Sequence, residues 1–504
     1  MANIFRINEK LDNFSPNYLA TICRIGLLKD IPNADKLKMT SVNGHDIIVS
    51  SDYKEGDVIV YFPCECAISE KYLSKNNLYE IGECDRNSNF ESVALLREQA
   101  HECQKKGDKE GADKFMALAK KDCGFFNKYG RVRILKLRGE YSDGFVAGIE
   151  SLIIAFPELA DINWDEYIDT QFNTINDETL CWKFVPPIKE SARPTGQGMH
   201  NKLQRRLAKR FDRLISEHFQ FHFDSIMLVE HVHQLSPDDI VNVSVKVHGT
   251  STINAMIPCN RKLSWWEKIK KFFGAKVEAT EYDLIYSSRK VIKNRYLNKD
   301  AHDFYGVDIW GCVARDFGPY IPKGMTVYGE IVGYLEGTNT MIQKQHDYGC
   351  KPGCWKFMPY RITTEIPDDT TTEVKRREWN VDEVDKWTHD LVEAHPELEE
   401  KILFLEIVYH GRLGDMYPDL DTEQHWHENF LDRLKNDKDW LLMEQDEPLC
   451  HNKVPREGYV IRIDNDKFPR AWKIKSKRHY EFEGKQHDKG EVDIEEAGGV
   501  EVEQ

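Results

Sequence analysis

The residues best suited to chemistry in this sequence are a lysine and the turn that follows it. Lys246 closes the alternating run Val243-Ser-Val-Lys246, and His248-Gly249-Thr comes two residues later. This pattern predicts a strand that holds a primary amine at its end, beside a glycine turn whose backbone can approach a phosphate. In its neutral form a lysine amine is a nucleophile. The Lys-x-x-Gly spacing alone is unspecific, however, because it also occurs elsewhere in the chain, for example at Lys136.

Charged and aromatic residues in later strand patterns support a role for Lys246. Glu330 stands inside an apolar strand pattern, and Glu457 opens a second one. Burying a carboxylate in such a strand is costly unless it meets a cation, so the two glutamates imply a polar pocket shared with basic residues. Lys473 and Lys475 would lie on one face of a further strand, because side chains alternate along a strand. Two further candidates are Arg289, which follows a strand pattern, and Tyr360, which lies in an aromatic one.

These residues need strands to position them, and a first region of strand character precedes them. Residues 17–69 alternate apolar and polar side chains between turn residues, and strand character returns at 130–139. The helical spacing of 92–121 predicts a helical hairpin inserted into a small barrel. Within 130–139, Arg131 and Arg133 lie in one phase of the alternation. They are either solvated charges on an edge strand or residues that face nucleic acid.

The second region follows a proline-containing connector. A basic helix is expected at 203–219, and short strands and helices then alternate from about 236 to 482, which predicts a domain of mixed type. We therefore expect four parts: a module over 1–165 with the helical insertion at about 85–125, the connector and basic helix over 166–222, the domain with Lys246 over 223–482, and an acidic tail over 483–504.

Composition excludes several classes of protein. A length of 504 residues with 40% hydrophobic and 31% charged residues fits a soluble protein of two or three domains, and no apolar stretch approaches the roughly 20 residues of a membrane span. The net charge of −16 means that only local basic patches could bind nucleic acid. The 12 scattered cysteines and the start without a signal-peptide pattern predict reduced thiols and a cytoplasmic address. We expect a monomer with no membrane partner.

In their order along the chain, the candidate residues resemble the motifs of the covalent nucleotidyltransferases. Histidine before the glycine is most similar to RNA ligases, because DNA ligases and capping enzymes usually have aspartate there. The resemblance covers about 224–482 and implies a nucleotidyltransferase (ATP-grasp-like ligase) domain of antiparallel sheets and helices. The matching residues are Lys246-x-His248-Gly249-Thr for motif I, Arg289 for Ia, Glu330 for III, Tyr360 for IIIa, Glu457 for IV and Lys473-x-Lys475 for V.

A second resemblance covers residues 17–148. The segments Asp30-Ile-Pro-Asn-Ala-Asp35, Lys54-Glu-Gly-Asp57 and Lys136-Leu-Arg-Gly139 are similar to an OB-like module. An OB-like β-barrel with a helical insertion, placed before a ligase domain, resembles the type 5 RNA ligase family. That resemblance implies the sealing of an RNA 3'-hydroxyl end to a 5'-phosphate, with RNA or a nicked RNA/DNA duplex as the partner and RNA repair as the setting.

The resemblance also implies a role for each candidate residue. Lys246 would take up AMP from ATP. Lys475 and the bound metal ion would destabilise the ammonium form of Lys246, and Lys473 and the metal ion would offset the charge that grows on the phosphates. The magnesium or manganese ion would be held by Glu330 and Glu457, which would also contact the ribose. Arg289 would contact the ribose or the substrate phosphate, Tyr360 would stack on the adenine, and His248 and Gly249 would lie on the phosphate side.

Two other classes of function stay open on the sequence. The first is another covalent nucleotidyltransferase, either a capping enzyme or a DNA ligase. Both usually carry a further OB domain after motif V, and the short acidic stretch after Lys475 leaves no room for one. The second is a non-catalytic RNA-binding protein with a decayed ligase domain. Such a protein would need none of the charged residues, yet every expected position is filled.

Two segments fall outside these motifs. Residues 265–273 are apolar on one helical face and basic on the other, so they could lie against nucleic acid or a membrane surface. We expect them to form an inserted helix packed on the domain. His346, Cys350 and Cys354 have spacings found in zinc sites, but the sequence offers no evident fourth ligand.

Overall fold

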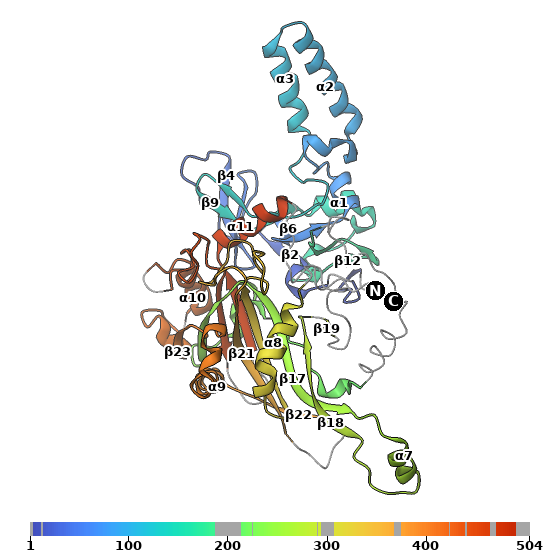
Figure 1. Cartoon of the computed structure of the whole chain (residues 1–504). Helices are drawn as coiled ribbons and strands as arrows, with labels where there is room; N and C mark the ends of the chain where they lie inside the picture. Colours follow the sequence, from blue (N-terminus) through green and yellow to red (C-terminus); the bar gives the residue numbers. More distant parts are fainter. Residues whose placement is uncertain are drawn as a thin grey trace. The chain divides into compact units, whose positions relative to one another are not determined.

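The chain folds as a mixture of helices and strands in two compact units. The computed structural model describes residues 4–11, 14–186, 213–223, 225–289, 291–293, 307–366, 374–422, 424–438, 441–463 and 470–489 (Figure 1). The first unit comprises Met1–Val185 with Tyr480–Lys485, and the second comprises Pro186–His479 with Gln486–Gln504. Residues 187–212, which include most of the predicted basic helix, and residues 490–504, most of the acidic tail, lie outside the described residues.

Short strands dominate the first unit. Its elements are β1 (Phe5–Arg6), β2 (Ala20–Arg24), β3 (Lys29–Asp30), β4 (Leu37–Val42), β5 (His45–Ser50), β6 (Val58–Pro63), β7 (Cys66–Ile68), α1 (Glu70–Lys75), α2 (Phe90–Lys105), α3 (Lys109–Lys121), β8 (Leu135–Leu137), β9 (Glu140–Ser142), β10 (Gly144–Gly148), α4 (Glu150–Ala155), β11 (Gln171–Phe172), β12 (Thr174–Ile175), β13 (Glu178–Thr179) and β14 (Cys181–Lys183).

The strands of the first unit form several separate small sheets. The largest has the order β10-β6-β2-β11, and the others are β3-β4-β5, β1-β12-β13, β14-β7 and β8-β9. Closure of a barrel requires every strand to pair on both sides, and edge strands such as β3 and β11 are only two residues long. In the described part of this unit the pairing therefore closes no barrel, and the predicted OB-like barrel is not confirmed.

Two sequence-based expectations for this unit have clear outcomes. The helices α2 and α3 occupy the region where helical spacing predicts a hairpin, and Asp108 caps α3 by accepting a hydrogen bond from the Gly111 amide. Arg131 does not face nucleic acid. Its guanidinium is buried and lies 3.1 Å from the buried carboxylate of Glu65, so the alternation that suggested a nucleic-acid-facing position marks an internal ion pair.

The second unit carries the candidate site. Its elements are β15 (Ile226–Met227), α6 (Leu228–His231), β16 (Ile240–Lys246), β17 (Thr250–Asn260), α7 (Trp265–Phe272), β18 (Thr280–Ser287), β19 (Ile292–Lys293), α8 (Ile309–Phe317), β20 (Met325–Gly333), β21 (Trp355–Ile366), β22 (Lys375–Glu378), α9 (Val381–Ala394), β23 (Ile407–Arg412), α10 (Trp426–Lys435), β24 (Gly458–Ile463) and β25 (Arg470–Lys475). The helix α11 (Lys477–Asp488) follows β25, and its residues Tyr480–Lys485 belong to the first unit.

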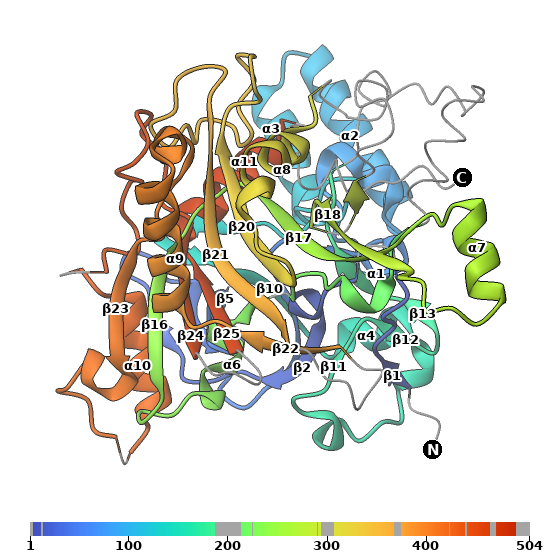
Figure 2. The same ribbon diagram turned by 60° about the horizontal axis from the view of Figure 1, so that its bottom comes forward.

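Two sheets organise the second unit (Figure 2). The first sheet has the order β15-β25-β24-β16-β23, and the second has the order β19-β18-β17-β20-β21-β22. All pairings are antiparallel except that of β15 with β25. Because β16 and β17 are consecutive strands in different sheets, the turn that follows Lys246 carries the chain from one sheet to the other.

One face of the six-stranded sheet is covered by α8 and α9. Val313 of α8 and Val384 of α9 share a buried apolar cluster with Val327 and Ile331 of β20. Since side chains alternate along a strand, Glu330 must point to the opposite face of the sheet. None of the helices in the described ranges combines the length and the apolar character that a membrane span requires.

Candidate functional site

Lys246 lies at the last position of β16, where it meets a buried carboxylate. The strand forms because Val241, Val243 and Val245 are buried in the core. Lys246 pairs with Gly458 of β24, so Glu457, the residue before Gly458, lies next to the lysine. The Lys246 Nζ donates a hydrogen bond of 2.9 Å to Glu457 Oε2.

Glu457 is shared between two lysines. Its side chain is only 2% exposed, and its second oxygen lies 3.2 Å from the Nζ of Lys475. His248 Nδ1 lies 3.9 Å from the oxygen that Lys246 contacts. Burial alone would raise the pKa of Glu457, but the ammonium groups of Lys246 and Lys475 outweigh burial and hold it well below its usual range. Glu457 is therefore a buried anion held between two cations.

The strand register places the two motif V lysines on the same face as Lys246. Gly458 of β24 pairs with Lys246 on one side and with Lys475 on the other, so these residues form one row across three strands. The next row on that face contains Val460 and Lys473. Directly paired residues point to the same side of a sheet. Lys246, Lys473 and Lys475 therefore present three cations on one face.

That face is turned toward the six-stranded sheet. Arg462, two residues beyond Val460 and on the same face, donates hydrogen bonds to the carbonyl oxygens of Tyr360 (3.2 Å) and Trp379 (2.7 Å). Tyr360 belongs to β21 of the other sheet. Arg462 therefore joins the two sheets beside the lysines.

Gly249 brings Glu330 close to the Lys246 turn. A Cβ atom at Gly249 would lie 2.4 Å from the Ile331 carbonyl oxygen and 2.7 Å from Glu330 Cγ, so only glycine fits here without a shift. The next residues enter β17, where Ser251 pairs with Glu330 and its hydroxyl donates to Glu330 Oε2 at 3.1 Å. Glu330 thus packs directly against the residues that follow the lysine.

His248 is fixed by contacts that its sequence position does not reveal. Its backbone amide donates to the Tyr348 hydroxyl oxygen at 2.6 Å. Its ring centre lies 5.0 Å from that of His346 and 4.8 Å from that of His479, both in edge-on geometry. Neither Tyr348 nor His479 was predicted as a site residue. No sequence signal marks them, since Tyr348 lies 100 residues from its partner.

The described residues do not assemble the zinc site considered from sequence. His346 is fully buried, and its ring nitrogens face the carbonyl oxygens of Lys344 (3.1 Å) and Pro455 (3.4 Å). Burial lowers the pKa of this histidine. No group of potential metal ligands in the described ranges contains His346 together with Cys350 and Cys354. His346 therefore packs against the segment that precedes Glu457, through its contact with the Pro455 carbonyl oxygen.

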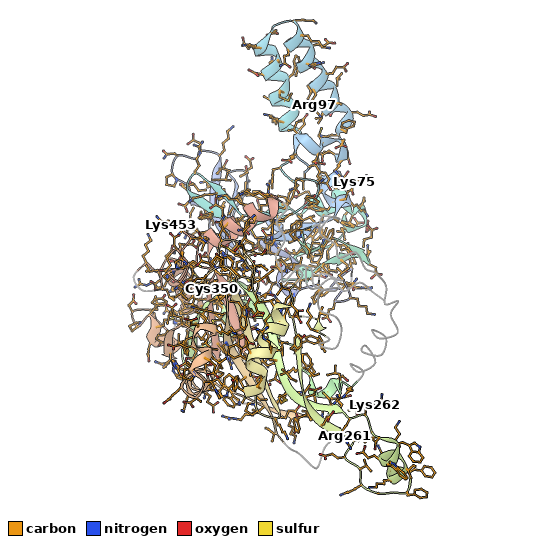
Figure 3. All side chains as sticks on the ribbon, viewed as in Figure 1. Lys75, Arg97, Arg261, Lys262, Cys350 and Lys453 are labelled. Carbon is orange, nitrogen blue, oxygen red and sulfur yellow. The ribbon has the colours of Figure 1, made fainter. Side chains whose placement is uncertain are left out.

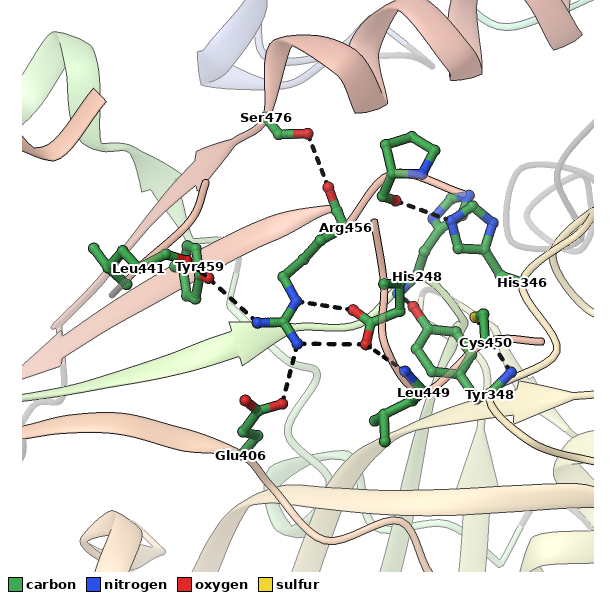
Figure 4. Close-up of polar contacts among 12 residues, drawn as sticks. His248, His346, Tyr348, Glu406, Leu441, Leu449, Cys450, Arg456, Tyr459 and Ser476 are labelled. Atoms are coloured by element: carbon green, nitrogen blue, oxygen red, sulfur yellow. Dashed lines mark hydrogen bonds and ion pairs between the residues drawn. The ribbon is translucent and has the colours of Figure 1, made fainter. Parts of the chain in front are cut away.

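A second buried ion pair holds the loop that carries Glu457 (Figure 4). The guanidinium of Arg456 contacts Glu447 at 3.1 Å, with both side chains almost fully buried, and it contacts Glu406 at 3.2 Å. The Arg456 carbonyl oxygen accepts a hydrogen bond of 2.8 Å from the Ser476 hydroxyl, one residue after Lys475. This network fixes the backbone on both sides of the Glu457–Lys475 pair.

Tyr360 lies at an irregularity of β21. Tyr328 pairs with Arg361 and Gly329 with Pro359, so Tyr360 is the extra residue of a β-bulge. A bulge re-aims a side chain, and Tyr360 packs on an apolar cluster that includes Val247, the residue after Lys246. Arg289 follows the end of β18, whose last residue Ser287 pairs with Ile253 of β17.

The structure thus brings most of the predicted residues together. Direct contacts join Lys246, His248, Glu457 and Lys475, and a second set joins Gly249 and Glu330. Lys473 shares the lysine face, and Tyr360 packs beside Val247. The nucleotide-binding and metal-binding roles of these residues and of Arg289 stay predictions.

Comparisons with known proteins give weak likenesses only. No protein-family model matches the chain, and no curated protein matches it. Among solved structures, the chain is similar to a mutant RNA ligase of Naegleria gruberi with AMP and manganese, at 16% identity and a TM-score of 0.48, over 92% of this chain and 98% of the other. The same ligase with pyrophosphate is similar at 16% identity and a TM-score of 0.46, over 93% of this chain and 99% of the other.

Proposed function

We propose that this chain is an ATP-dependent RNA ligase that joins an RNA 3'-hydroxyl end to a 5'-phosphate. The observation that supports the proposal is the Lys246–Glu457–Lys475 cluster, with Lys246 at the end of a strand and Gly249 and Glu330 packed against the following turn. An amine in this position can attack a phosphate, and the cations around it can stabilise the charge that develops.

The residues fit ATP by their charge and placement. Lys246, Lys473 and Lys475 would neutralise a triphosphate, because all three share one sheet face. Tyr360 would stack on the adenine from its bulge beside Val247, and Arg289 would contact the ribose or the substrate phosphate. His248 and Gly249 would line the phosphate side of the turn.

We further propose that a magnesium or manganese ion would be held by Glu330 and Glu457. When bound, such an ion would offset negative charge on the phosphates. Both oxygens of Glu457 face lysine ammonium groups in this structure. Transfer of AMP to Lys246 would remove one of those positive charges, so Oε2 of Glu457 would become available as a ligand in the adenylylated protein.

The reaction would run in three displacements. The Lys246 Nζ would lose a proton and attack the α-phosphorus of ATP, forming a P–N bond and releasing pyrophosphate. An oxygen of the RNA 5'-phosphate would then displace the lysine, which takes up a proton. The RNA 3'-hydroxyl would finally attack the 5'-phosphorus and release AMP. The depressed pKa of Glu457 supports a role for this carboxylate as the counter-ion of Lys246.

We place the enzyme near the type 5 RNA ligases because the OB-like sequence segments precede the nucleotidyltransferase motifs in the same order. The first unit would then help to bind the RNA, and nicks with an RNA 3'-hydroxyl strand are the expected substrate. We expect the protein to act in the cytoplasm as a monomer. Nicked duplexes with RNA or DNA on the 3'-hydroxyl side test this choice, and equal sealing of both would overturn the RNA assignment.

The first experiment is covalent labelling with ATP that is radioactive at the α-phosphate. The full chain with Mg²⁺ should keep the label through denaturing electrophoresis, and Lys246→Ala should abolish it. Lys453→Ala is the matched control, because Lys453 is an exposed lysine in the segment before Glu457. Label that survives in Lys246→Ala would reject the proposed nucleophile. Label from GTP in place of ATP would favour a capping-type enzyme, and no label at all would favour a non-catalytic RNA-binding protein.

A further inference from the structure

The helix α7 (Trp265–Phe272) does not pack on its domain, in contrast to the sequence-based expectation. It occupies the tip of the connection between β17 and β18 and projects beyond the sheet (Figures 1 and 2). Its aromatic residues are among the most exposed apolar side chains of the described chain: Trp265 66%, Trp266 67%, Phe272 86% and, just past its end, Phe273 80%. Solvent exposure of four large aromatic side chains in one segment marks an interaction surface.

Local contacts fold and fix this helix without help from the core. Ser264 and Glu267 form a reciprocal capping box at its start. Arg261 contacts the Glu267 carboxylate at 2.6 Å and the Glu278 carbonyl oxygen at 2.9 Å, which ties the helix to both strands of the connection. Figure 3 shows Arg261 and Lys262 where this extension leaves the sheet. The helix is therefore a preformed element.

The helix separates its apolar and charged residues by face. At about 100° per residue, Trp265, Trp266, Ile269, Phe272 and Phe273 fall within a stripe of about 120°, and the charged residues occupy the rest. Lys268 and Lys270 border the two edges of the stripe, while Glu267 and Lys271 lie opposite to it. The connection between β17 and β18 is strongly basic, since it carries Arg261, Lys262, Lys268, Lys270, Lys271 and Lys276 against the two acidic residues Glu267 and Glu278.

In contrast to the sequence-based expectation of no membrane partner, we propose that α7 is a docking helix for an anionic lipid membrane surface. Interfacial helices bury a face of Trp and Phe at the level of the headgroups, and lysines at the edges of that face reach the lipid phosphates. The positions of Lys268 and Lys270 match this arrangement. The surface would hold the protein peripherally and reversibly, because a helix of two turns buries little area. This docking function is independent of the proposed ligase activity.

The arrangement fits a membrane better than single-stranded RNA. An RNA-binding platform presents aromatic rings and cations together, so that bases stack while the neighbouring phosphates are neutralised. On α7 the rings pair edge to face, with Trp265 and Trp266 4.6 Å apart and Phe272 and Phe273 5.5 Å apart, and Lys268 and Lys270 lie at the borders of the aromatic stripe and not between the rings. A second copy of the chain would bring the same lysines against each other, which like-charge repulsion disfavours.

Vesicle co-sedimentation of the full chain tests the proposal. Vesicles of phosphatidylcholine with phosphatidylserine should bind the protein, vesicles of phosphatidylcholine alone should bind it less, and added salt should weaken the binding. The double change Trp265→Ala/Trp266→Ala should reduce binding to the anionic vesicles at least about tenfold. Leu27→Ala is the matched control, because Leu27 is 66% exposed in the other unit and should have no effect.

A second variant, Lys268→Glu/Lys270→Glu, changes the charge but leaves the aromatic stripe intact and should also weaken the binding. Unchanged thermal unfolding and an unchanged circular dichroism spectrum would show that these variants fold. Failure of the wild-type chain to bind anionic vesicles would overturn the proposal, as would wild-type vesicle binding by a folded double tryptophan variant. The proposal would also be overturned if the double tryptophan variant kept its vesicle binding and lost only its affinity for single-stranded RNA. It would likewise be overturned if that variant lost only self-association, measured by light scattering.

Discussion

At the scale of single residues, the site is built around one buried anion. Glu457 lies between the ammonium groups of Lys246 and Lys475, and each of its oxygens faces one of them. A carboxylate this deeply buried is stable as an anion only because both cations are close. The cost of removing it should therefore appear in stability as well as in chemistry.

The effect of Glu457→Gln on stability at different pH values tests this balance between the burial of the carboxylate and its two cations. We expect a loss of stability toward the lower end of the roughly 3–5 kcal/mol typical of a broken buried ion pair. The pKa of Glu457 is depressed in the folded protein, so its contribution is present above its ordinary value of 4.5 and is lost as the pH falls below that value. Urea unfolding of both proteins across this range should show the difference shrinking toward acid. A difference that grows toward acid would contradict the assignment.

The close packing of Gly249 gives a second prediction. Gly249→Ala places a methyl group against Glu330 and the Ile331 carbonyl oxygen, so we expect a destabilisation of about 1–3 kcal/mol and a loss of covalent labelling by ATP. Gly82→Ala is the control, because nothing lies within 4 Å of a Cβ atom there. Thermal unfolding and labelling of the two variants give the comparison. Equal behaviour of both variants would contradict the inferred close approach.

The sequence could predict the types of the site residues but not all of their partners. Lys246, Glu330, Glu457 and the motif V lysines are recognisable because each stands in a strand pattern with a characteristic spacing. The ring contacts of His248 and its bond to Tyr348 join residues about a hundred or more positions apart. Such contacts depend on which strands pair, and local spacing does not specify strand pairing.

At the scale of elements, the loop before β24 is the part that positions Glu457. Arg456 and Glu447 form a buried pair, and the Arg456 carbonyl oxygen is tied to Ser476. Glu457 comes directly before β24, and Ser476 comes directly after β25. The Arg456–Glu447 pair and the Arg456–Ser476 hydrogen bond together therefore fix the distance between the Glu457 carboxylate and Lys475. They act on the site through the backbone.

A double-mutant cycle measures the contribution of that pair. Arg456→Met leaves Glu447 buried without its cation, so we expect a destabilisation of about 3–5 kcal/mol. Adding Glu447→Gln removes the buried charge, so the double variant should be less destabilised than the sum of the single variants. Urea unfolding gives all four values. Lys386→Met, in an exposed pair with Asp390, should change stability little, and strict additivity at Arg456 would contradict the account.

Two elements show why sequence patterns were incomplete at this scale. The spacing of residues 265–273 correctly predicts an amphipathic helix, but an apolar stripe does not say whether the rest of the chain covers it. Tyr360 was placed in a strand, yet the bulge that makes it the extra residue depends on the pairing of β20 with β21. Whether the helix stripe is covered, and where the bulge in β21 falls, both depend on which other parts of the chain pack or pair with these elements.

At the scale of the whole molecule, the chain is divided between two units. The contacts that join Lys246, Gly249, Glu330, Glu457 and Lys475 all lie within the second unit. The mixed α+β class could be predicted from the sequence, since strand and helix patterns alternate clearly. Barrel closure in the first unit could not, because closure depends on pairing between distant short strands.

Removal of the α2–α3 hairpin tests whether the site in the second unit depends on this part of the first unit. Asn89 Nδ2 donates to the Asp122 carbonyl oxygen at 2.7 Å, so the two ends of the hairpin are adjacent and a short Gly-Ser linker can replace residues 90–121. We expect the shortened protein to fold and to be labelled by ATP at a rate within about twofold of the full chain. The same linker inserted at Gly107, at the tip of the hairpin, is the control. A folded deletion variant without labelling would show that the first unit is needed for the first step.

The most direct test of the central claim is to locate the adenylyl group by peptide mass spectrometry after the full chain is mixed with ATP and Mg²⁺. The account predicts one AMP adduct on the peptide that contains Lys246, lost on addition of pyrophosphate because the first displacement is reversible. An adduct on any other residue, or a folded protein that takes up no AMP, would contradict it.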